Sequence, residues 1–165
     1  RPVHFSTMSS RRLMHELKAL QSENNEEVTL RSVSDSGLLD WRASIRGPPD
    51  TPYADIYYEL IITVPTAYPL QPPTVSFATK VFHPNVHFKT GEICLDLLKN
   101  AWSAVYTLQA VCRAIISLLA HPEADSPLNC DCGNLLRSGD SRGYNSMARM
   151  YAKLYGSATP IISEE

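Results

Sequence analysis

The spacing of apolar residues changes along the chain and predicts where helices and strands lie. Near the N-terminus, an apolar stripe at helical spacing predicts an amphipathic helix that ends near Ser22, with Ser9 or Ser10 as its cap. Residues 107–120 give the strongest helical pattern, with an apolar face that fits a central core helix. Weaker helical patterns follow at residues 130–137 and 141–155.

Three strand-like runs follow the first helix and are separated by turn residues. They cover residues 28–33, 38–45 and 56–64, and the short gaps between them favour an antiparallel meander. The run PTAYPLQPP at residues 65–73 then predicts an extended, polyproline-like crossing, because its prolines restrict the backbone. A fourth short strand is predicted at residues 74–77.

The composition fits one folded domain with no general affinity for nucleic acid. A chain of 165 residues, 44% of them hydrophobic, can bury a single core without disulfides or metal. Basic residues number 15 and acidic residues 17, and neither sign forms a long block. We predict that residues 9–157 form the domain, that residues 1–8 are a cloning remnant or a disordered N-terminus, and that residues 158–165 are a flexible tail.

The four cysteines, found without a secretory signal, indicate reduced thiols in an intracellular protein. The longest apolar stretch, at residues 108–120, contains Arg113 and is too short to span a bilayer. Direct membrane insertion is therefore not expected, and association with a membrane would require a protein partner.

The candidate chemistry lies between residues 78 and 106, where neither helical nor strand periodicity persists. Cys94 stands there between Ile93 and Leu95, a setting shared by small buried cysteines and by nucleophiles held on a rigid loop. Asn85 offers an uncharged amide donor for a developing oxyanion, although asparagine after proline also serves simply as a turn residue. From the residues alone, both interpretations stay open at each position.

Two other chemistries for the cysteines are disfavoured by the pattern. A thiol hydrolase needs a histidine beside Cys94, and none of His83, His87 and His121 lies in a catalytic motif. A zinc site could be drawn from the Cys-x-Cys pair at residues 130–132, but a structural zinc site needs a second pair. No metal site is therefore predicted.

Three segments together resemble the catalytic domain of ubiquitin-conjugating enzymes. They are GPPDTPYADIYYELIITVPTAYPLQPPTVSF, HPNVHFKTGEICLDLL and AWSAVYTLQAVCRAIISLLAHPEADSPLN, and the match follows the family's order and spacing over residues 11–134. The resemblance is specific, because a His-Pro-Asn motif, a Gly-x-Ile-Cys-Leu block, Trp-Ser and Asp-x-Pro-Leu occur together. An additional residue between His83 and Cys94, and the segment DSPLNCDCGNLLRSGDSRGY, resemble the peroxisomal branch, which acts in import-receptor recycling.

The resemblance implies an α+β fold, with a four-stranded antiparallel meander sheet flanked by about four helices. It also implies that Cys94 accepts ubiquitin as a thioester from an activating enzyme and, with a RING ligase, transfers it to a substrate. ATP is used by the upstream activating enzyme, so no cofactor is expected in this chain, and the sequence has no phosphate-binding loop motif. A lysine-directed conjugating enzyme of another pathway and a non-catalytic family scaffold are the alternatives.

Residues near the nucleophile receive roles from the same resemblance. Asn85 would support the oxyanion or the loop, and Leu95 and Asp96 would contact the ubiquitin tail. Ser126 stands where many lysine-directed members carry an acidic residue before the proline, so the resemblance points to a cysteine acceptor on the import receptor. Alternatively, Ser126 merely ends the core helix and Asp125 supplies the charge.

Partner surfaces are implied in two regions. Arg11 and Arg12 match the basic start of the first helix, which contacts the activating enzyme in the family, although a solvated helix face is the simpler explanation. Ligase-binding positions match Leu70, Ala104 and Val105. Members that work with many RING ligases often carry Phe and Pro-Ala at these places, so restriction to a few ligases is expected.

The peroxisomal branch works at a membrane, which implies a membrane-anchored peroxisomal partner for a chain with no membrane segment. The expected location is cytoplasmic and peripheral, on the cytosolic face of the peroxisomal membrane. Residues 141–155 carry more apolar surface than one helix face needs, so Met150 and Tyr151 are predicted to dock this partner, with packing on the core as the alternative.

Overall fold

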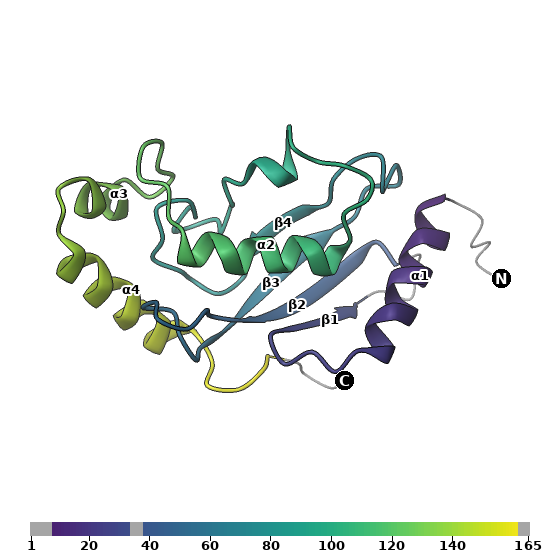
Figure 1. Cartoon of the computed structure of the whole chain (residues 1–165), viewed down its shortest axis with the longest axis horizontal. Helices are drawn as coiled ribbons and strands as arrows, with labels where there is room; N and C mark the ends of the chain where they lie inside the picture. Colours follow the sequence, from purple (N-terminus) through teal and green to yellow (C-terminus); the bar gives the residue numbers. More distant parts are fainter. Residues whose placement is uncertain (1–7, 34–37, 162–165) are drawn as a thin grey trace.

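An antiparallel sheet with one helix across it and further helices at both ends makes up the computed structural model, which describes residues 8–33 and 38–161 (Figure 1). The sheet order is β1-β2-β3-β4, which confirms the predicted α+β meander. The strands are β1 (Val28–Ser32), β2 (Asp40–Arg46), β3 (Tyr57–Thr63) and β4 (Thr74–Phe77). The helices are α1 (Met8–Ser22), α2 (Leu108–Ala120), α3 (Cys130–Arg137), α4 (Ser141–Tyr155) and a short 3-10 helix, η1 (Asp96–Leu98).

Alternation of side chains along the strands gives the sheet one buried face. Ala43, Leu60 and Phe77 lie opposite one another in a row across β2, β3 and β4, and all three are buried. On the outward face, Arg42 and Glu59 form an ion pair of 3.6 Å. α2 crosses the sheet, and its buried residues join those of the strands in one core cluster (Figure 1).

Three of the α-helices, α2, α3 and α4, begin after a residue whose side chain caps them. The Thr107 hydroxyl accepts a hydrogen bond from the Ala110 N–H at 3.1 Å, so α2 begins at Leu108, one residue after the predicted start. The side chains of the residues before α3 and α4 accept equivalent bonds. α1 differs, because it begins at Met8 and includes Ser9 and Ser10, so neither serine is its N-cap, as the sequence had suggested.

The proline-rich segment 65–73 turns instead of running extended, so that expectation was wrong. The Tyr68 N–H donates to the Pro65 carbonyl at 3.0 Å, and the Leu70 N–H donates to the Ala67 carbonyl at 2.9 Å. Proline fixes its own φ, but it leaves the residues between prolines free to turn. The turns leave Leu70 on the surface, 68% exposed.

The segment after α4 lies against the sheet. Ser157 pairs with Tyr57 in an isolated antiparallel bridge, and the Ile161 N–H donates to the Ser44 hydroxyl at 3.0 Å. Residues 158–161 of the expected tail are thus hydrogen-bonded near β2 and β3. The rest of that expected tail and most of the expected N-terminal remnant lie outside the described residues.

Candidate active site

Cys94 is exposed at the end of a short run that two isolated β-bridges hold in place. Glu92 pairs with Ser76 of β4, and Ile93 pairs with Val86. Ile93 is buried, so the backbone is anchored directly before the thiol. Cys94 is therefore not a buried apolar filler but a thiol presented on fixed backbone.

Gly91 makes the turn that brings this run back to β4. Its φ is +73°, a conformation that residues with a Cβ rarely adopt. Its carbonyl accepts a hydrogen bond from the Phe77 N–H at 2.9 Å. A Cβ on Gly91 would lie 2.0 Å from the Phe77 carbonyl oxygen, so only glycine permits the approach that positions Cys94.

Asn85 joins the segment formed by residues 92–94 to the loop that follows α2. Its carbonyl accepts the Cys94 N–H at 2.9 Å. Its buried side chain forms a two-point pairing with the Glu123 backbone: Nδ2 donates to the carbonyl at 2.8 Å, and Oδ1 accepts from the N–H at 2.8 Å. Oδ1 and one N–H of Nδ2 therefore hold the loop, and the second N–H of Nδ2 is the donor that a role at the oxyanion would use.

His83 is a neutral, buried imidazole beneath this loop. Its Nδ1 accepts the Asn85 N–H at 3.0 Å, which leaves Nε2 to donate to the Leu118 carbonyl at 2.9 Å. Burial lowers the pKa of His83 to about 4. With both ring nitrogens occupied, His83 shapes the loop and cannot serve as a base for Cys94.

The other two histidines considered for a thiol hydrolase also bind backbone groups. His87 Nδ1 accepts hydrogen bonds from the N–H groups of Lys89 and Thr90, at 3.3 and 3.2 Å. His121 Nδ1 donates to the Ser117 carbonyl at 3.0 Å. The geometry therefore gives no support to a cysteine–histidine hydrolase.

A groove of about 290 Å³ opens beside the thiol, and we call it the Cys94 groove. It brings together every residue that the sequence placed near the nucleophile, including Asp125 and Ser126 from the loop after α2. That loop is fixed further along, where the Leu128 N–H donates to the Pro84 carbonyl at 2.8 Å. Sequence reasoning missed two lining residues, Leu118 and Glu123. The full lining is Asn85, Cys94, Leu95, Asp96, Leu118, Glu123, Asp125 and Ser126.

The positions matched to ligase binding form a second exposed region. Leu70 and Val105 are 68% and 77% exposed, the highest values among the large apolar side chains of the described residues. The segments that carry them are neighbours, because the Trp102 indole N–H donates to the Pro69 carbonyl at 2.9 Å. We call Leu70 and Val105 together the Leu70–Val105 surface.

The two arginines matched to activating-enzyme binding differ from each other. Arg11 is exposed. Arg12 is half-buried and donates to the carbonyls of Ala104 and Tyr106 at 2.7 and 2.8 Å, and to the Glu16 carboxylate at 2.8 Å. Ala104 thus contacts Arg12 through its backbone carbonyl, and the Arg12 side chain is hydrogen-bonded within the fold.

The two residues of α4 predicted to dock a membrane-anchored partner also differ. Met150 is 44% exposed. Tyr151 packs in an aromatic cluster, with ring centroids 5.8 Å from Phe82, 5.0 Å from Phe88 and 5.9 Å from Tyr155. Of the two residues, Met150 therefore offers the exposed apolar side chain, whereas the Tyr151 ring packs against other aromatic rings.

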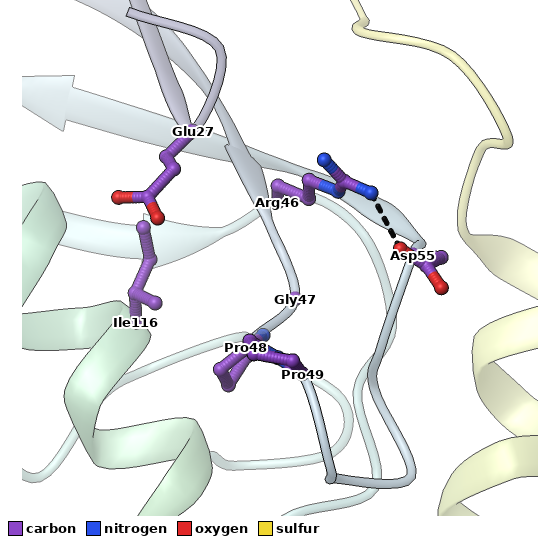
Figure 2. Close-up of a pocket in the computed structure, with 7 residues that line it drawn as sticks. All are labelled: Glu27, Arg46, Gly47, Pro48, Pro49, Asp55 and Ile116. Atoms are coloured by element: carbon purple, nitrogen blue, oxygen red, sulfur yellow. Dashed lines mark hydrogen bonds and ion pairs between the residues drawn. The ribbon is translucent and has the colours of Figure 1, made fainter.

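A pocket of about 250 Å³ elsewhere shares no lining residue with the Cys94 groove (Figure 2). Its Arg46 guanidinium already pairs with Asp55 at 2.5 Å, and Pro48 and Pro49 form part of its wall. No cysteine lines it, so it offers no second thiol centre.

The remaining cysteines are divided between core and surface. Cys112 and Cys132 are buried, and burial raises the pKa of each thiol to about 12, whereas Cys130 is exposed. Within residues 8–33 and 38–161, no three His, Cys, Asp or Glu side chains are grouped so that they could hold a metal ion. The same described part contains no helix long and apolar enough to cross a membrane.

Known proteins of one family match this chain over most of its length. The family model described as "Ubiquitin-conjugating enzyme" matches residues 12–152. "Ubiquitin-conjugating enzyme E2 pex4" of Dictyostelium discoideum is 65% identical over 145 residues, 88% of this chain and 97% of that protein. "Protein PEROXIN-4" of Arabidopsis thaliana is 60% identical over 147 residues, 88% and 94% of the two chains. The crystal structure of H. polymorpha Pex4p in complex with the soluble domain of Pex22p is similar with a TM-score of 0.84 at 36% identity, over 92% of this chain and 100% of that one.

Proposed function

The chain belongs to the ubiquitin-conjugating enzyme family, and we propose on this basis that Cys94 accepts ubiquitin as a thioester and passes it to an acceptor. The exposed thiol at the Cys94 groove is the observation that carries this proposal. The Cys94 thiolate attacks the carbonyl carbon of the ubiquitin thioester on an activating enzyme. A new carbon–sulfur bond forms, and the cysteine thiolate of the activating enzyme leaves. ATP is consumed by that enzyme, so this chain needs no cofactor of its own.

The surroundings of the thiol suit a thioester that must survive until an acceptor arrives. His83 is neutral and bound at both nitrogens, so it does not activate water against the thioester. Asn85, which lines the groove, is fixed by its pairing with Glu123. Leu95 and Asp96 line the groove beside the thiol, where the ubiquitin tail would lie.

The second part of the proposal is a peroxisomal role, supported by the two relatives named for peroxin-4. With a RING ligase, the enzyme would transfer ubiquitin to the peroxisomal import receptor on the cytosolic face of the membrane. Ser126, in place of an acidic residue, favours a cysteine acceptor, because a thiol needs less help than an ammonium group in losing its proton. A lysine-directed role in another pathway is the alternative.

A membrane-anchored partner that holds the enzyme at the peroxisome is the third part. The H. polymorpha relative, solved with the soluble domain of Pex22p, supports a partner of this kind. Met150 on α4 would dock it, since this apolar side chain is 44% exposed. Met150→Glu should abolish binding to the soluble domain of a Pex22p-like partner, whereas Met14→Glu on α1, where Met14 is 39% exposed, should not. A large fall in melting temperature for Met150→Glu alone would instead place Met150 in the core.

The central test is charging of the protein by an activating enzyme with ATP and ubiquitin, followed by gels with and without reducing agent. The parent should form an adduct that thiols cleave. Cys94→Ser should form a thiol-resistant ester more slowly, or no adduct. Cys130→Ser, which changes the other exposed cysteine, should charge like the parent.

Each alternative predicts a different result in the same assay. A non-catalytic scaffold would form no adduct at all. A hydrolase would cleave ubiquitin esters without the activating enzyme. Undiminished thiol-sensitive charging of Cys94→Ser would show that another cysteine carries ubiquitin.

A further inference from the structure

Glu16 of α1 is a buried carboxylate that the proposed reaction does not use. It is 5% exposed. Its Oε1 accepts hydrogen bonds from Arg12 Nε at 2.8 Å and from the Tyr68 hydroxyl at 2.5 Å. Its Oε2 accepts the N–H of Leu108, the first residue of α2, at 2.9 Å. One carboxylate therefore joins α1, the turn segment 65–73 and the start of α2.

Arg12 extends this set of contacts to the loop formed by residues 103–106. Its Nη1 donates to the Ala104 carbonyl at 2.7 Å, and its Nη2 donates to the Tyr106 carbonyl at 2.8 Å. The guanidinium carbon also lies 5.8 Å from the centroid of the Tyr68 ring, within the range of a cation–π contact. Two carbonyls of a four-residue loop are thus held by one side chain from a distant helix.

The same contacts orient the Leu70–Val105 surface. The rings of Tyr68 and Tyr106 lie 6.0 and 5.9 Å from the ring of Trp102, measured between centroids. Tyr68 lies within the turn that exposes Leu70, and Tyr106 directly follows Val105. Moving the loop relative to the turn would therefore separate the two exposed apolar side chains.

We propose that Arg12 and Glu16 are a positioning pair that sets the loop 103–106 for ligase binding. The partner fitted by the surface is an apolar one, because Leu70 and Val105 are its protruding side chains. Only the identity of that partner as a ligase rests on the proposed function. Arg12 is hydrogen-bonded within the fold, whereas its neighbour Arg11 is exposed.

The geometry requires arginine at position 12. Its planar group reaches one carboxylate and two carbonyls with three different nitrogens. A lysine ammonium keeps the charge but is a single point, so it cannot span the same three acceptors. Arg12→Lys therefore separates the effect of geometry from that of charge, and Lys18→Ala, at an exposed position of α1, controls for loss of charge on the same helix.

Hydrogen exchange in the free protein tests the positioning role without ubiquitin or a ligase. In Arg12→Ala, the Tyr106 and Leu108 amides and the Trp102 indole N–H should exchange at least tenfold faster than in the parent. Arg12→Lys should show a smaller increase, and Lys18→Ala should stay within twofold. Parent-like protection in Arg12→Ala would overturn the proposal. If Arg12→Ala fails to fold, the same comparison is made with Arg12→Lys.

Ligase-stimulated discharge of the Cys94 thioester tests the consequence for function, with a RING domain that accelerates discharge in the parent as the probe. Arg12→Ala should raise the half-saturating RING concentration at least fivefold and keep the maximal rate within twofold, because the surface is displaced while the groove is intact. A lower maximal rate with unchanged half-saturation, or an equal shift in Lys18→Ala, would contradict the positioning role. If no RING domain stimulates the parent, the proposed function fails, and the exchange result still decides the role of Arg12.

Discussion

The Cys94 groove and the Leu70–Val105 surface are both built on loops, but different forces hold them. Around the groove, Asn85 and His83 bind backbone groups with an amide and a neutral imidazole. At the loop 103–106, Glu16 and Arg12 act with full charges. The hydrogen bonds around the thiol therefore bring no strong base beside it, whereas the loop 103–106 is oriented by an ion pair between buried Glu16 and half-buried Arg12.

The kind of interaction in each region sets how much stability should be lost when that interaction is removed. Loss of a neutral hydrogen bond costs about 1 kcal/mol of stability, because water partly replaces it in the unfolded chain. Loss of one partner of a buried ion pair costs about 3–5 kcal/mol, because the other charge is left uncompensated. The following predictions test that difference.

Glu16→Gln should cause the largest loss of stability, about 4 kcal/mol in the free energy of unfolding. The new amide nitrogen would face groups that donate hydrogen bonds, and Arg12 would lose its charged partner. Denaturant unfolding measures the loss. The control is Glu23→Gln, an exposed acid that accepts from Gln109 at 3.0 Å, which should change stability by less than about 0.5 kcal/mol. Equal losses of stability in Glu16→Gln and Glu23→Gln would contradict the expected large contribution of the Glu16 ion pair.

His83 should make stability fall in acid. Its pKa of about 4 in the folded protein lies below the ordinary 6.5, so the unfolded chain binds the proton more readily. Its contribution is present above pH 6.5 and is lost as the pH falls toward 4, by on the order of 3 kcal/mol in total. Unfolding of the parent and of His83→Gln between pH 7 and 4 measures it, with the exposed His121→Gln as control. If the stability difference between the parent and His83→Gln does not become smaller as the pH falls, His83 is not the group whose protonation destabilises the fold.

Asn85→Ala should reduce stability by about 2 kcal/mol, because it removes both hydrogen bonds to Glu123. Discharge of the Cys94 thioester should also slow by roughly tenfold or more, because the wall of the groove is no longer fixed relative to the thiol. Single-turnover discharge and denaturant unfolding are the measurements, and Asn100→Ala, at an exposed position, is the control. Loss of stability without slower discharge would mean that the pairing supports the fold but not the groove.

Ser126→Asp should give the smallest change, a few-fold rise in the rate of discharge to lysine relative to cysteine. A carboxylate at this exposed edge of the groove would orient an ammonium and help remove its proton. Near pH 7, roughly 3% of free thiols but only about 0.04% of free amines are deprotonated, so a thiol gains less from that help. The measurement is discharge to free cysteine and to free lysine in both proteins. An unchanged ratio would show that Ser126 does not set acceptor preference, or that Asp125 already supplies the charge.

Features determined by local sequence were predictable. The bounds of α3 and α4 match the apolar pattern, and α2 starts after its capping Thr107. β4 has the predicted bounds, and the bounds of the other three strands differ from prediction by one or two residues. The groove was also foreseeable, since the family motifs place Asn85, Cys94 and Ser126 in a recognisable order.

Features that depend on distant pairings were not predictable. The i, i+4 spacing of Arg12 and Glu16 indicates an ion pair, but nothing local indicates that Arg12 also reaches Ala104, 92 residues away. Glu123 enters the active site through its backbone, 38 residues from Asn85, and a backbone contact leaves no mark on side-chain identity. The role of a charged residue on a helix surface therefore has to be taken from the fold.

Because two cysteines are exposed and two are buried, the number of thiols that react with a labelling reagent reports the state of the protein. Cys94 and Cys130 are open to an alkylating reagent, whereas Cys112 and Cys132 lie in the core with thiols whose pKa burial raises to about 12. Mass spectrometry after brief labelling would thus count two modified thiols per native molecule, four once the core has opened, and one while ubiquitin occupies Cys94. A single spectrum of intact protein would separate folded, unfolded and loaded populations without any engineered probe.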